Sequence, residues 1–333
     1  MSDNLFVSII IPCRNEERFI GKCLESIAEQ DYPKDNLEVL VIDGKSEDKT
    51  REIVKDFSLK YPYIKLLDNP QKFTPFALNI GIREARGDVI VRIDAHAGYE
   101  KDYVSKCLWH LKESGADNVG GIIKTLPSIN TISARAIAFV LSHPFGAASY
   151  FRKGSKEARC VDTVFGGCFK REVFDKVGLF NEKMVRSQDI EFNKRLKRAG
   201  GKILLVPEII ARYYPQTTLK GFFRHNFQDG FWTIYPLSFG VRFFSLRHLI
   251  PLILVAGFLT GLVLGMFLFW GKVLFILIFG SYLLLNLIFS LEIALREGLK
   301  LFPALTLSFF SRHFGYGLGS IWGLIKIVLS RTH

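Results

Sequence analysis

The sequence predicts an α/β domain built on a mostly parallel sheet, followed by an α-helical membrane region. Two patterns carry this prediction. Over residues 5–210, short apolar runs of strand length alternate with segments of helical periodicity, which is the order of βαβ units. The charges then nearly stop: 38 of the 44 Lys and Arg residues and 30 of the 32 acidic residues lie before residue 249. A chain of 333 residues has room for both parts.

The strands of the first part are expected where short runs are mostly apolar. Such runs are typical of strands buried on both faces of a parallel sheet. They occupy residues 6–11, 37–42, 64–67, 89–93, 118–123 and 203–206. Helical periodicity lies between them, at residues 20–27, 53–57, 75–85, 172–177 and 188–199. Ligands of such sheets bind beyond the carboxyl ends of the strands, so the residues that follow each run are candidates for a site.

Two uncharged segments predict membrane-spanning helices. Residues 249–270 and 273–291 carry no charge, and each is close to the ~20 apolar residues that cross a bilayer core. A third apolar stretch, 301–329, is interrupted by an Arg-His pair, and the sequence leaves open whether it spans, dips or lies on the surface. We therefore expect a membrane region with two or three helices over residues 249–333.

Residues 216–248 are expected to form an amphipathic segment at the membrane surface, after a catalytic domain over 1–215. One helix face of this segment is apolar at every fourth position: Leu219, Phe223, Phe227 and Phe231. Packing of this helix against the catalytic domain is the alternative. Glycines repeat at the same spacing in the membrane region, at Gly315, Gly319 and Gly323. Such a stripe would let another helix approach closely; a flexible glycine-rich membrane turn is the alternative.

Composition places the chain at a membrane rather than on a nucleic acid. The net charge is +12, but the basic residues are dispersed and form no nucleic-acid-binding motif. Lys and Arg near anionic headgroups are typical of the cytosolic side of membrane proteins. The apolar run at residues 5–11 is too short for a secretory signal, and the five cysteines show no paired metal spacing. We expect a multi-pass protein of the cell (inner) membrane with a cytosolic catalytic domain.

The run at 89–93 leads into Asp94-Ala95-His96, the most informative stretch of the sequence. An Asp and a His two residues apart can both turn outward where a strand ends, giving one oxygen and one imidazole ligand for a divalent cation. A solvated Asp beside a packed His is the alternative. The sequence contains no phosphate-binding glycine loop, so the charge of a bound nucleotide diphosphate would have to be met by a cation. This need favours the metal site.

Two further carboxylates are candidates for chemistry. Asp43 closes the second strand run, where its carboxylate can accept hydrogen bonds from a nucleobase or a ribose; capping of the next helix is the alternative. Asp189 stands in the first turn of a predicted helix. Glu191 precedes Arg195 by four residues and is expected to pair with it, which leaves Asp189 to project elsewhere. There Asp189 could act as a general base, or could simply favour the helix dipole.

Together these stretches resemble the motifs of family 2 glycosyltransferases. They fall in the order of that family: VSIIIPCRNE at 7–16, VIDGKSED at 41–48, ALN through GDVI at 77–90, and QD at 188–189 before a helix. The resemblance covers residues 5–210. It is closest to the bacterial exopolysaccharide branch of the succinoglycan type, in which Asp-x-His often replaces Asp-x-Asp and membrane helices follow the catalytic domain. It implies a GT-A fold, which binds nucleotide sugars on a mixed, mostly parallel sheet.

The resemblance also implies a role for each candidate residue. The reaction would be an inverting transfer from a nucleoside diphosphate sugar to a hydroxyl of a lipid-linked glycan or polysaccharide. Asp94, with His96, would hold Mg²⁺ or Mn²⁺ against the diphosphate, and Asp189 would deprotonate the acceptor. The residues implied to bind the nucleotide sugar are Pro12, Arg14, Asn15, Glu16, Asp43 and Asp94, with Asp43 at the nucleoside. Those implied to line the acceptor side are Gly166, Gly167 and Cys168, for which a tight turn in a strand is the alternative.

Two other functions stay open. A processive polysaccharide synthase typically carries Gln-x-x-Arg-Trp after the base, whereas residues 228–232 read Gln-Asp-Gly-Phe-Trp. The second open function is a catalytically inactive membrane anchor that binds a nucleotide sugar. The presence of Asp43, Asp94 and Asp189 together argues against it. The sequence does not identify the sugar, the nucleotide or the acceptor. It also leaves open whether the chain acts as a homo-oligomer or within a polysaccharide assembly complex.

Overall fold

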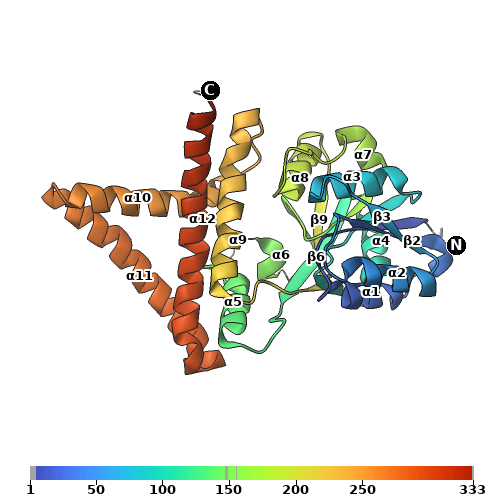
Figure 1. The fold of residues 1–333 in the computed structure, drawn as a ribbon, viewed down its shortest axis with the longest axis horizontal. Helices are drawn as coiled ribbons and strands as arrows, with labels where there is room; N and C mark the ends of the chain where they lie inside the picture. The colour runs from blue at the N-terminus through green and yellow to red at the C-terminus, as the bar shows by residue number, and fades with distance from the viewer. Residues whose placement is uncertain (1–4, 147–148, 155, 332–333) are drawn as a thin grey trace. The chain divides into compact units, whose positions relative to one another are not determined.

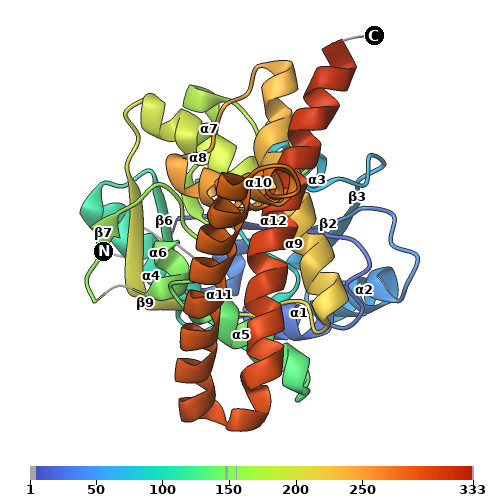
Figure 2. The same ribbon diagram turned by 90° about the vertical axis from the view of Figure 1, so that its left-hand side faces the viewer.

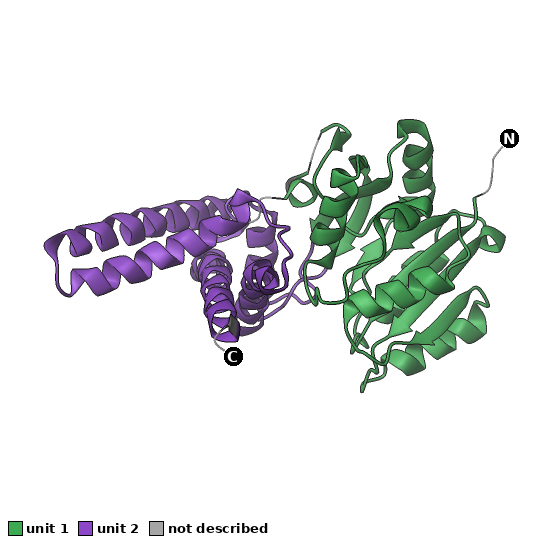
Figure 3. Cartoon of the chain, turned by 90° about the horizontal axis from the view of Figure 1, so that it is seen from above, with its two compact units in different colours: residues 1–124, 149–213 green, residues 125–148, 214–333 purple. Residues whose placement is uncertain are grey.

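The computed structural model describes residues 5–146, 149–154 and 156–331. The chain divides into two compact units, coloured separately in Figure 3. Unit 1 holds residues 1–124 and 149–213, and unit 2 holds residues 125–148 and 214–333. Residues 125–148 thus belong to the second unit, although the sequence places them inside a continuous catalytic domain. The reason is an apolar helix, α5 (Ile132–Ser142), whose buried face packs on helices of unit 2.

Unit 1 is built on one mixed sheet (Figure 1). Its described strands are β1 (Val7–Cys13), β2 (Leu37–Asp43), β3 (Ile64–Asp68), β4 (Val89–Arg92), β5 (Ala97–Tyr99), β6 (Asn118–Thr125), β7 (Arg159–Cys160), β8 (Cys168–Lys170) and β9 (Ile203–Tyr213). In space they follow the order β3-β2-β1-β4-β8-β6-β9-β5, with β7 beside β9. Strands β3, β2, β1 and β4 run parallel, whereas β8 is antiparallel to β4 and β6, and β9 to β5 and β7. The parallel part is therefore the amino-terminal half of the sheet.

Helices cover both faces of this sheet. Those of unit 1 are α1 (Ile20–Ala28), α2 (Thr50–Lys60), α3 (Thr74–Glu84), α4 (Tyr103–Ser114), α6 (Tyr150–Lys153), α7 (Glu172–Val177) and α8 (Gln188–Arg198), with a 3-10 turn, η1, at Lys34–Asn36. Ile9 and Ile11 of β1 join the core formed with α1, α2 and α4, while Ile10 joins the core formed with α3, α7 and α8. Because successive strand residues face opposite sides, a sheet covered twice requires the continuous apolar runs seen in the sequence.

The parallel strands end at a common edge. Cys13 at the end of β1 lies opposite Asp43 at the end of β2, and Asp43 lies opposite Asp68 at the end of β3. On the other side of β1, Ile10 pairs with Arg92, so the residues that follow β4 emerge at the same edge. The loops that carry the candidate residues of β1, β2 and β4 are thereby gathered, as expected for a sheet of this kind.

Unit 2 is helical (Figure 2). Besides α5 its described helices are α9 (Leu219–Ile234), α10 (Ile250–Gly265), α11 (Phe269–Glu297) and α12 (Phe302–Arg331), with 3-10 turns η2 (Tyr235–Phe239), η3 (Leu246–Leu249) and η4 (Leu299–Leu301). Two described stretches, Leu246–Gly265 and Phe269–Glu297, are long and apolar enough to cross a membrane. They coincide with the two uncharged segments that the sequence predicts as spans.

Helices α9 and α12 pack closely through the predicted glycine stripe. A Cβ atom added to Gly319 would lie 1.9 Å from the carbonyl oxygen of Phe227, and one added to either of the other two glycines of the repeat would lie 3.0 or 3.1 Å from a carbonyl oxygen one turn away on α9. The expectation that another helix approaches this stripe is confirmed. The backbone of α9 meets α12 at Phe223, Phe227 and Phe231. These residues belong to the face that the sequence assigns to the membrane surface.

The Arg-His pair of the third apolar stretch does not interrupt α12. The Nε of Arg312 donates to the carbonyl oxygen of Gly146 at 2.9 Å, and its guanidinium also bonds the amide oxygen of Asn226. His313 Nε2 lies 2.9 Å from the carbonyl oxygen of Phe145. Both polar side chains therefore have partners inside unit 2, which is why one helix continues through them.

Candidate active site

A cavity of about 240 Å³ lies at the carboxyl edge of the parallel strands in unit 1. We call it the edge cavity. Of the residues predicted from the sequence, it is lined by Pro12, Arg14, Glu16, Asp94 and His96. It is also lined by Cys13, Asn69, Lys72, Phe73, Thr74, Ala77, Arg92, Ala95 and Gln188. The loops after β1, β3 and β4 thus meet around one hollow, which brings the predicted cation pair and most of the predicted nucleotide residues together.

Asp94 is placed at this cavity by the buried strand β4. Its backbone N–H donates to the hydroxyl of Tyr99 at 2.9 Å, which fixes the turn between β4 and β5. Its Oδ1 accepts a hydrogen bond from Arg92 Nη2 at 3.1 Å, and its side chain is 18% exposed. Asp94 is therefore a partly accessible carboxylate that is paired with the guanidinium of Arg92, two residues earlier.

His96 stands beside Asp94 on the lining and is oriented by Glu16. Its Nδ1 lies 3.1 Å from Glu16 Oε1, and its ring packs edge-on against Tyr213. Burial works to lower the pKa of His96, but the hydrogen bond to Glu16 and the charges of Glu16 and Asp94 outweigh it, so the pKa is raised. When Nδ1 donates to Glu16, Nε2 is the ring nitrogen that can serve as a ligand, an arrangement common around protein metals.

These two groups fit a cation that is shared with a bound diphosphate. Asp94 can offer a carboxylate oxygen, a ligand type suited to Mn²⁺ and Mg²⁺, and His96 can offer its Nε2, a ligand type that suits a transition metal better than Mg²⁺. Residues 5–146, 149–154 and 156–331 contain no cluster of three His, Cys, Asp or Glu side chains that could hold a metal alone. A cation held by one or two protein groups completes its shell with phosphate oxygens and water, as Mg²⁺ usually does at nucleotide sites.

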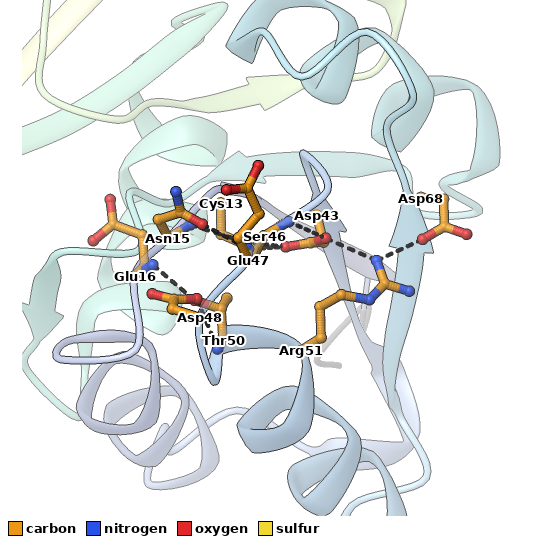
Figure 4. Close-up of polar contacts among 10 residues, drawn as sticks. All are labelled: Cys13, Asn15, Glu16, Asp43, Ser46, Glu47, Asp48, Thr50, Arg51 and Asp68. Carbon is orange, nitrogen blue, oxygen red and sulfur yellow. Dashed lines mark hydrogen bonds and ion pairs between the residues drawn. The ribbon is translucent and has the colours of Figure 1, made fainter.

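Asp43 does not face the edge cavity. Figure 4 shows its carboxylate enclosed by the loop that follows β2: Oδ2 accepts from the backbone N–H of Ser46 at 3.0 Å and from Arg51 Nη1 at 2.7 Å. The Ser46 hydroxyl bonds Oδ1, and the side chain is fully buried. The carboxylate thus already has protein partners, and the nucleoside contact implied by the resemblance stays a prediction. Asp43 closes the turn before α2, close to the capping role that the sequence left open.

Asn15 holds the loops rather than lining the cavity. Its backbone N–H donates to the Ser46 hydroxyl at 2.8 Å, and its side-chain oxygen accepts from the backbone N–H of Glu47 at 2.9 Å (Figure 4). Asn15 and Lys45 both have φ near +56°, a conformation that costs a non-glycine residue free energy. The two loops therefore brace each other and fix the segment that carries Arg14 and Glu16 into the cavity.

Asp189 is near the cavity through Arg92 and Gln188. Glu191 pairs with Arg195 at 2.7 Å, as predicted, and Asp189 projects elsewhere from the first turn of α8. Its Oδ2 lies 3.8 Å from Arg92 Nη1, its side chain is 34% exposed, and its neighbour Gln188 lines the cavity. The predicted base and the predicted cation ligand, Asp94, thus contact the same guanidinium.

The residues predicted for the acceptor side are packed against β4. The carbonyl oxygen of Gly167 accepts the backbone N–H of Arg92 at 2.9 Å, and a Cβ on Gly166 would lie 2.7 Å from the Arg92 carbonyl oxygen. Both glycines have positive φ, at 67° and 123°. Cys168 is fully buried in β8 opposite Val91. The glycines therefore allow close backbone packing, and Cys168 is a core residue; the place of these residues on the acceptor side stays a prediction.

Sequence reasoning missed two buried polar residues on the lining. Arg92 is 8% exposed inside an otherwise apolar strand, and an arginine in such a run is a signal because arginine is rarely buried without a partner. Asn69 is 1% exposed, and its side-chain amide donates to the carbonyl oxygen of Phe73 at 2.9 Å. Nothing in its local pattern distinguishes it from a turn asparagine. Cys13 also lines the cavity, where burial and the charges of Asp43 and Glu16 raise the pKa of its thiol.

With this geometry in hand, the chain can be placed among known proteins. The family model described as Glycosyl transferase family 2 matches residues 8–178. The chain belongs to this family, as the motifs predict, and is a glycosyltransferase. The matched range contains β1 to β8 and so includes the strands that end at the edge cavity.

Two curated relatives extend the similarity beyond this range. Over 329 residues the chain is 32% identical to the dolichyl N-acetyl-alpha-D-glucosaminyl phosphate 3-beta-D-2,3-diacetamido-2,3-dideoxy-beta-D-glucuronosyltransferase of Methanococcus voltae, covering 96% of this chain and 98% of that protein. It is 28% identical over 247 residues to succinoglycan biosynthesis protein ExoA of Rhizobium meliloti (strain 1021), covering 69% of this chain and 74% of that protein. The predicted similarity to the succinoglycan-type branch is confirmed.

A solved structure supports the fold. The mannosyltransferase PcManGT from Pyrobaculum calidifontis, in complex with GDP-Man and Mn²⁺, superposes with a TM-score of 0.61 at 18% sequence identity, covering 96% of this chain and 88% of that one. At this identity the likeness speaks for the fold alone. The sheet of unit 1 accordingly has the GT-A fold that the sequence predicts.

Proposed function

We propose that the protein transfers a sugar, with inversion at the anomeric carbon, from a nucleoside diphosphate sugar to a hydroxyl of a lipid-linked glycan or polysaccharide. The observation that carries the proposal is the edge cavity, which both Asp94 and His96 line. Asp189, on α8, contacts the guanidinium of Arg92, and so does Asp94. Asp94 and His96 suit a diphosphate and its cation. Asp189 supplies a carboxylate for the attacking hydroxyl.

On the donor side, the residues present match the needs of a diphosphate. Arg14, Lys72 and Arg92 bring positive charge to the lining. Asp94 and His96 would hold Mg²⁺ or Mn²⁺, which would neutralise the negative charge that develops on the departing diphosphate. Glu16 orients the His96 ring by its contact with Nδ1. The hydrogen bonds of Asp43 and Asn15 with the loop after β2 would keep these groups in position.

On the acceptor side, Asp189 is proposed as the general base. Its side chain is about one third exposed, so an acceptor hydroxyl can approach it. The carboxylate would take the hydroxyl proton as the oxygen attacks the anomeric carbon from the face opposite the leaving diphosphate. This in-line displacement is what makes the transfer an inverting one.

The acceptor is proposed to be presented at the cytosolic face of a membrane. Two helices of unit 2 have the length and composition of spans, and the glucuronosyltransferase of Methanococcus voltae acts, by its name, on a dolichyl phosphate sugar. A lipid-linked acceptor would be anchored in the same bilayer as those helices. Such placement would raise the local concentration of acceptor near the enzyme.

The test uses the full chain in detergent and a panel of nucleotide sugars. We expect release of the nucleoside diphosphate to depend on Mn²⁺ or Mg²⁺ and to stop with EDTA. Asp189→Asn should lower transfer by about 100-fold or more, because a general base contributes that much, while donor binding is retained. Asp175→Asn, an exposed carboxylate on α7, is the matched control. Normal turnover of Asp189→Asn would remove Asp189 as the base, and long polymers as products would favour a processive synthase.

A further inference from the structure

Arg92 occupies an unusual place between the two halves of the edge cavity. It is the last residue of the buried strand β4 and is 8% exposed. Its Nη2 lies 3.1 Å from Asp94 Oδ1, and its Nη1 lies 3.8 Å from Asp189 Oδ2. Its Nε finds no hydrogen-bond acceptor within the described ranges. One buried positive charge is therefore shared by the carboxylates proposed for the cation and for the acceptor.

The backbone of Arg92 is fixed, so its side chain is the part that can respond. The Arg92 N–H is bonded to the carbonyl oxygen of Gly167, and β4 pairs with β1 through Ile10. The guanidinium, by contrast, meets a carboxylate at each side at distances that differ by less than an ångström. A planar, always charged fork can shift its stronger contact from one carboxylate to the other with a small side-chain movement.

We infer that Arg92 is a positioning residue that couples the donor side of the site to the acceptor side. This inference rests on the proposed function. In the free enzyme the guanidinium neutralises Asp94, and a divalent cation at Asp94 competes with it for the same carboxylate. Displaced from Asp94, the guanidinium strengthens its contact with Asp189 and holds that carboxylate toward the acceptor. Asp189 is thus in place when the donor is bound.

A purely structural arginine makes the opposite prediction for metal binding. If Arg92 only fills and braces the site, its removal disorders Asp94 and weakens the binding of a cation. If Arg92 competes with the cation, its removal strengthens that binding, because a positive charge a few ångströms from the metal is gone. The sign of the change in Mn²⁺ affinity therefore separates the two roles without any reference to activity.

The experiment titrates the full chain in detergent with Mn²⁺ alone and counts free Mn²⁺ by electron paramagnetic resonance. Arg92→Gln should bind Mn²⁺ about three- to tenfold more tightly than wild type, allowing for screening by solvent at a partly open site. Its turnover should nevertheless fall by about tenfold or more, since Asp189 loses its partner. Arg83→Gln, an exposed arginine on α3, removes the same charge elsewhere and should change neither quantity.

Arg92→Lys separates charge from bridging. Lysine keeps the positive charge but lacks the planar fork that presents separate N–H groups to the two carboxylates. Its Mn²⁺ affinity should stay within about twofold of wild type while turnover still falls. If Arg92→Gln does not fold, this variant carries the test, and wild-type turnover in it would overturn the inference.

The outcomes distinguish this inference from the proposed function. A wild type that neither binds Mn²⁺ nor releases nucleotide overturns both. A wild type that does both, together with a folded Arg92→Gln whose Mn²⁺ affinity is unchanged or weaker, overturns the inference alone. Tighter Mn²⁺ binding with reduced turnover supports it.

Discussion

Two carboxylates that look alike in the sequence have different surroundings at the carboxyl edge of the sheet. Asp43 and Asp94 each follow a run of buried apolar residues on neighbouring parts of the same sheet. Asp43 is fully buried and bonded to Ser46 and Arg51. The side chain of Asp94 is 18% exposed and lines the edge cavity. An apolar run followed by Asp therefore identifies the edge of the sheet but not which carboxylate faces a ligand.

The difference comes from the residues that follow each strand. After β2 the chain folds back over Asp43, and Gly44 permits the turn because a Cβ there would lie 2.9 Å from the carbonyl oxygen of Lys72. Ser46 then closes on the carboxylate. After β4 the chain passes through Ala95 and His96 directly into β5 and leaves Asp94 at the cavity. Asp43 thus fixes the loop after β2, which helps to hold the residues around Asp94 in place.

The largest effect that would test this comparison is expected from Asp94→Asn. Loss of the charge should lower transfer by about 10²–10³-fold, because an electrostatic group at the departing diphosphate is worth that much. The melting temperature should fall less than for Asp43→Asn, since Asp94 is partly exposed and Arg92 keeps Asp189 as a partner. Sugar transfer and thermal unfolding of the same preparation check both statements.

The matched control for Asp94→Asn is Asp56→Asn on α2, an exposed carboxylate that the cavity does not include. It should leave transfer at the wild-type level. Equal activity of the two variants would contradict the assignment of Asp94 to the donor side.

Asp43→Asn should show the reverse pattern, a loss of stability that exceeds the loss of activity per folded molecule. Replacing one side of a buried ion pair commonly costs about 3–5 kcal/mol, and here about 2–3 kcal/mol is expected because Arg51 is one third exposed and keeps Asp68 as a partner. Differential scanning fluorimetry measures the fall in melting temperature. An unchanged melting temperature together with lost donor binding would instead place Asp43 in direct contact with the nucleoside.

Asp68→Asn is the companion variant for that measurement. Asp68 pairs with the same Arg51 at the same 2.7 Å, but its side chain is 68% exposed. An exposed ion pair contributes at most about 1 kcal/mol, so this variant should be nearly as stable as wild type. A loss as large as that of Asp43→Asn would mean that burial does not explain the difference between the two partners of Arg51.

The same contrast explains how far the sequence could be read. Strand periodicity and the position of Asp94-Ala95-His96 are local features, and the structure brings Asp94 and His96 to one cavity with Glu16. The pairing of Glu191 with Arg195 is also local, because i and i+4 residues are neighbours on any helix. Features of this kind depend on residues that are close in sequence, so they can be predicted without knowledge of the tertiary structure.

What the sequence did not predict depends on contacts between distant segments. Asp43 is buried because Arg51 reaches it from α2, and Arg92 matters because α8 brings Asp189 beside it nearly 100 positions later. The place of α5 in unit 2 follows from helices that lie more than 70 residues further along the chain. The periodicity of the sequence does not record such distant partners, so it did not predict these contacts.

A smaller effect than that of Asp43→Asn is expected at Glu38, a third sheet carboxylate, near the start of the same strand that ends at Asp43. It is 1% exposed; burial works to raise its pKa, but hydrogen bonds from Ser8 and Arg86 and the Arg86 charge outweigh it and lower the pKa. A lowered pKa contributes stability above the unfolded value of about 4.3, and this contribution is lost as the pH falls through the folded value. Glu38→Gln should thus cost about 1–2 kcal/mol at pH 7 and progressively less below about pH 4. Thermal unfolding of wild type and Glu38→Gln across this pH range measures the difference in their stability. A difference that stays constant would mean that the shape of Glu38, not its charge, matters. A difference that disappears at low pH would mark Glu38 as a structural carboxylate like Asp43.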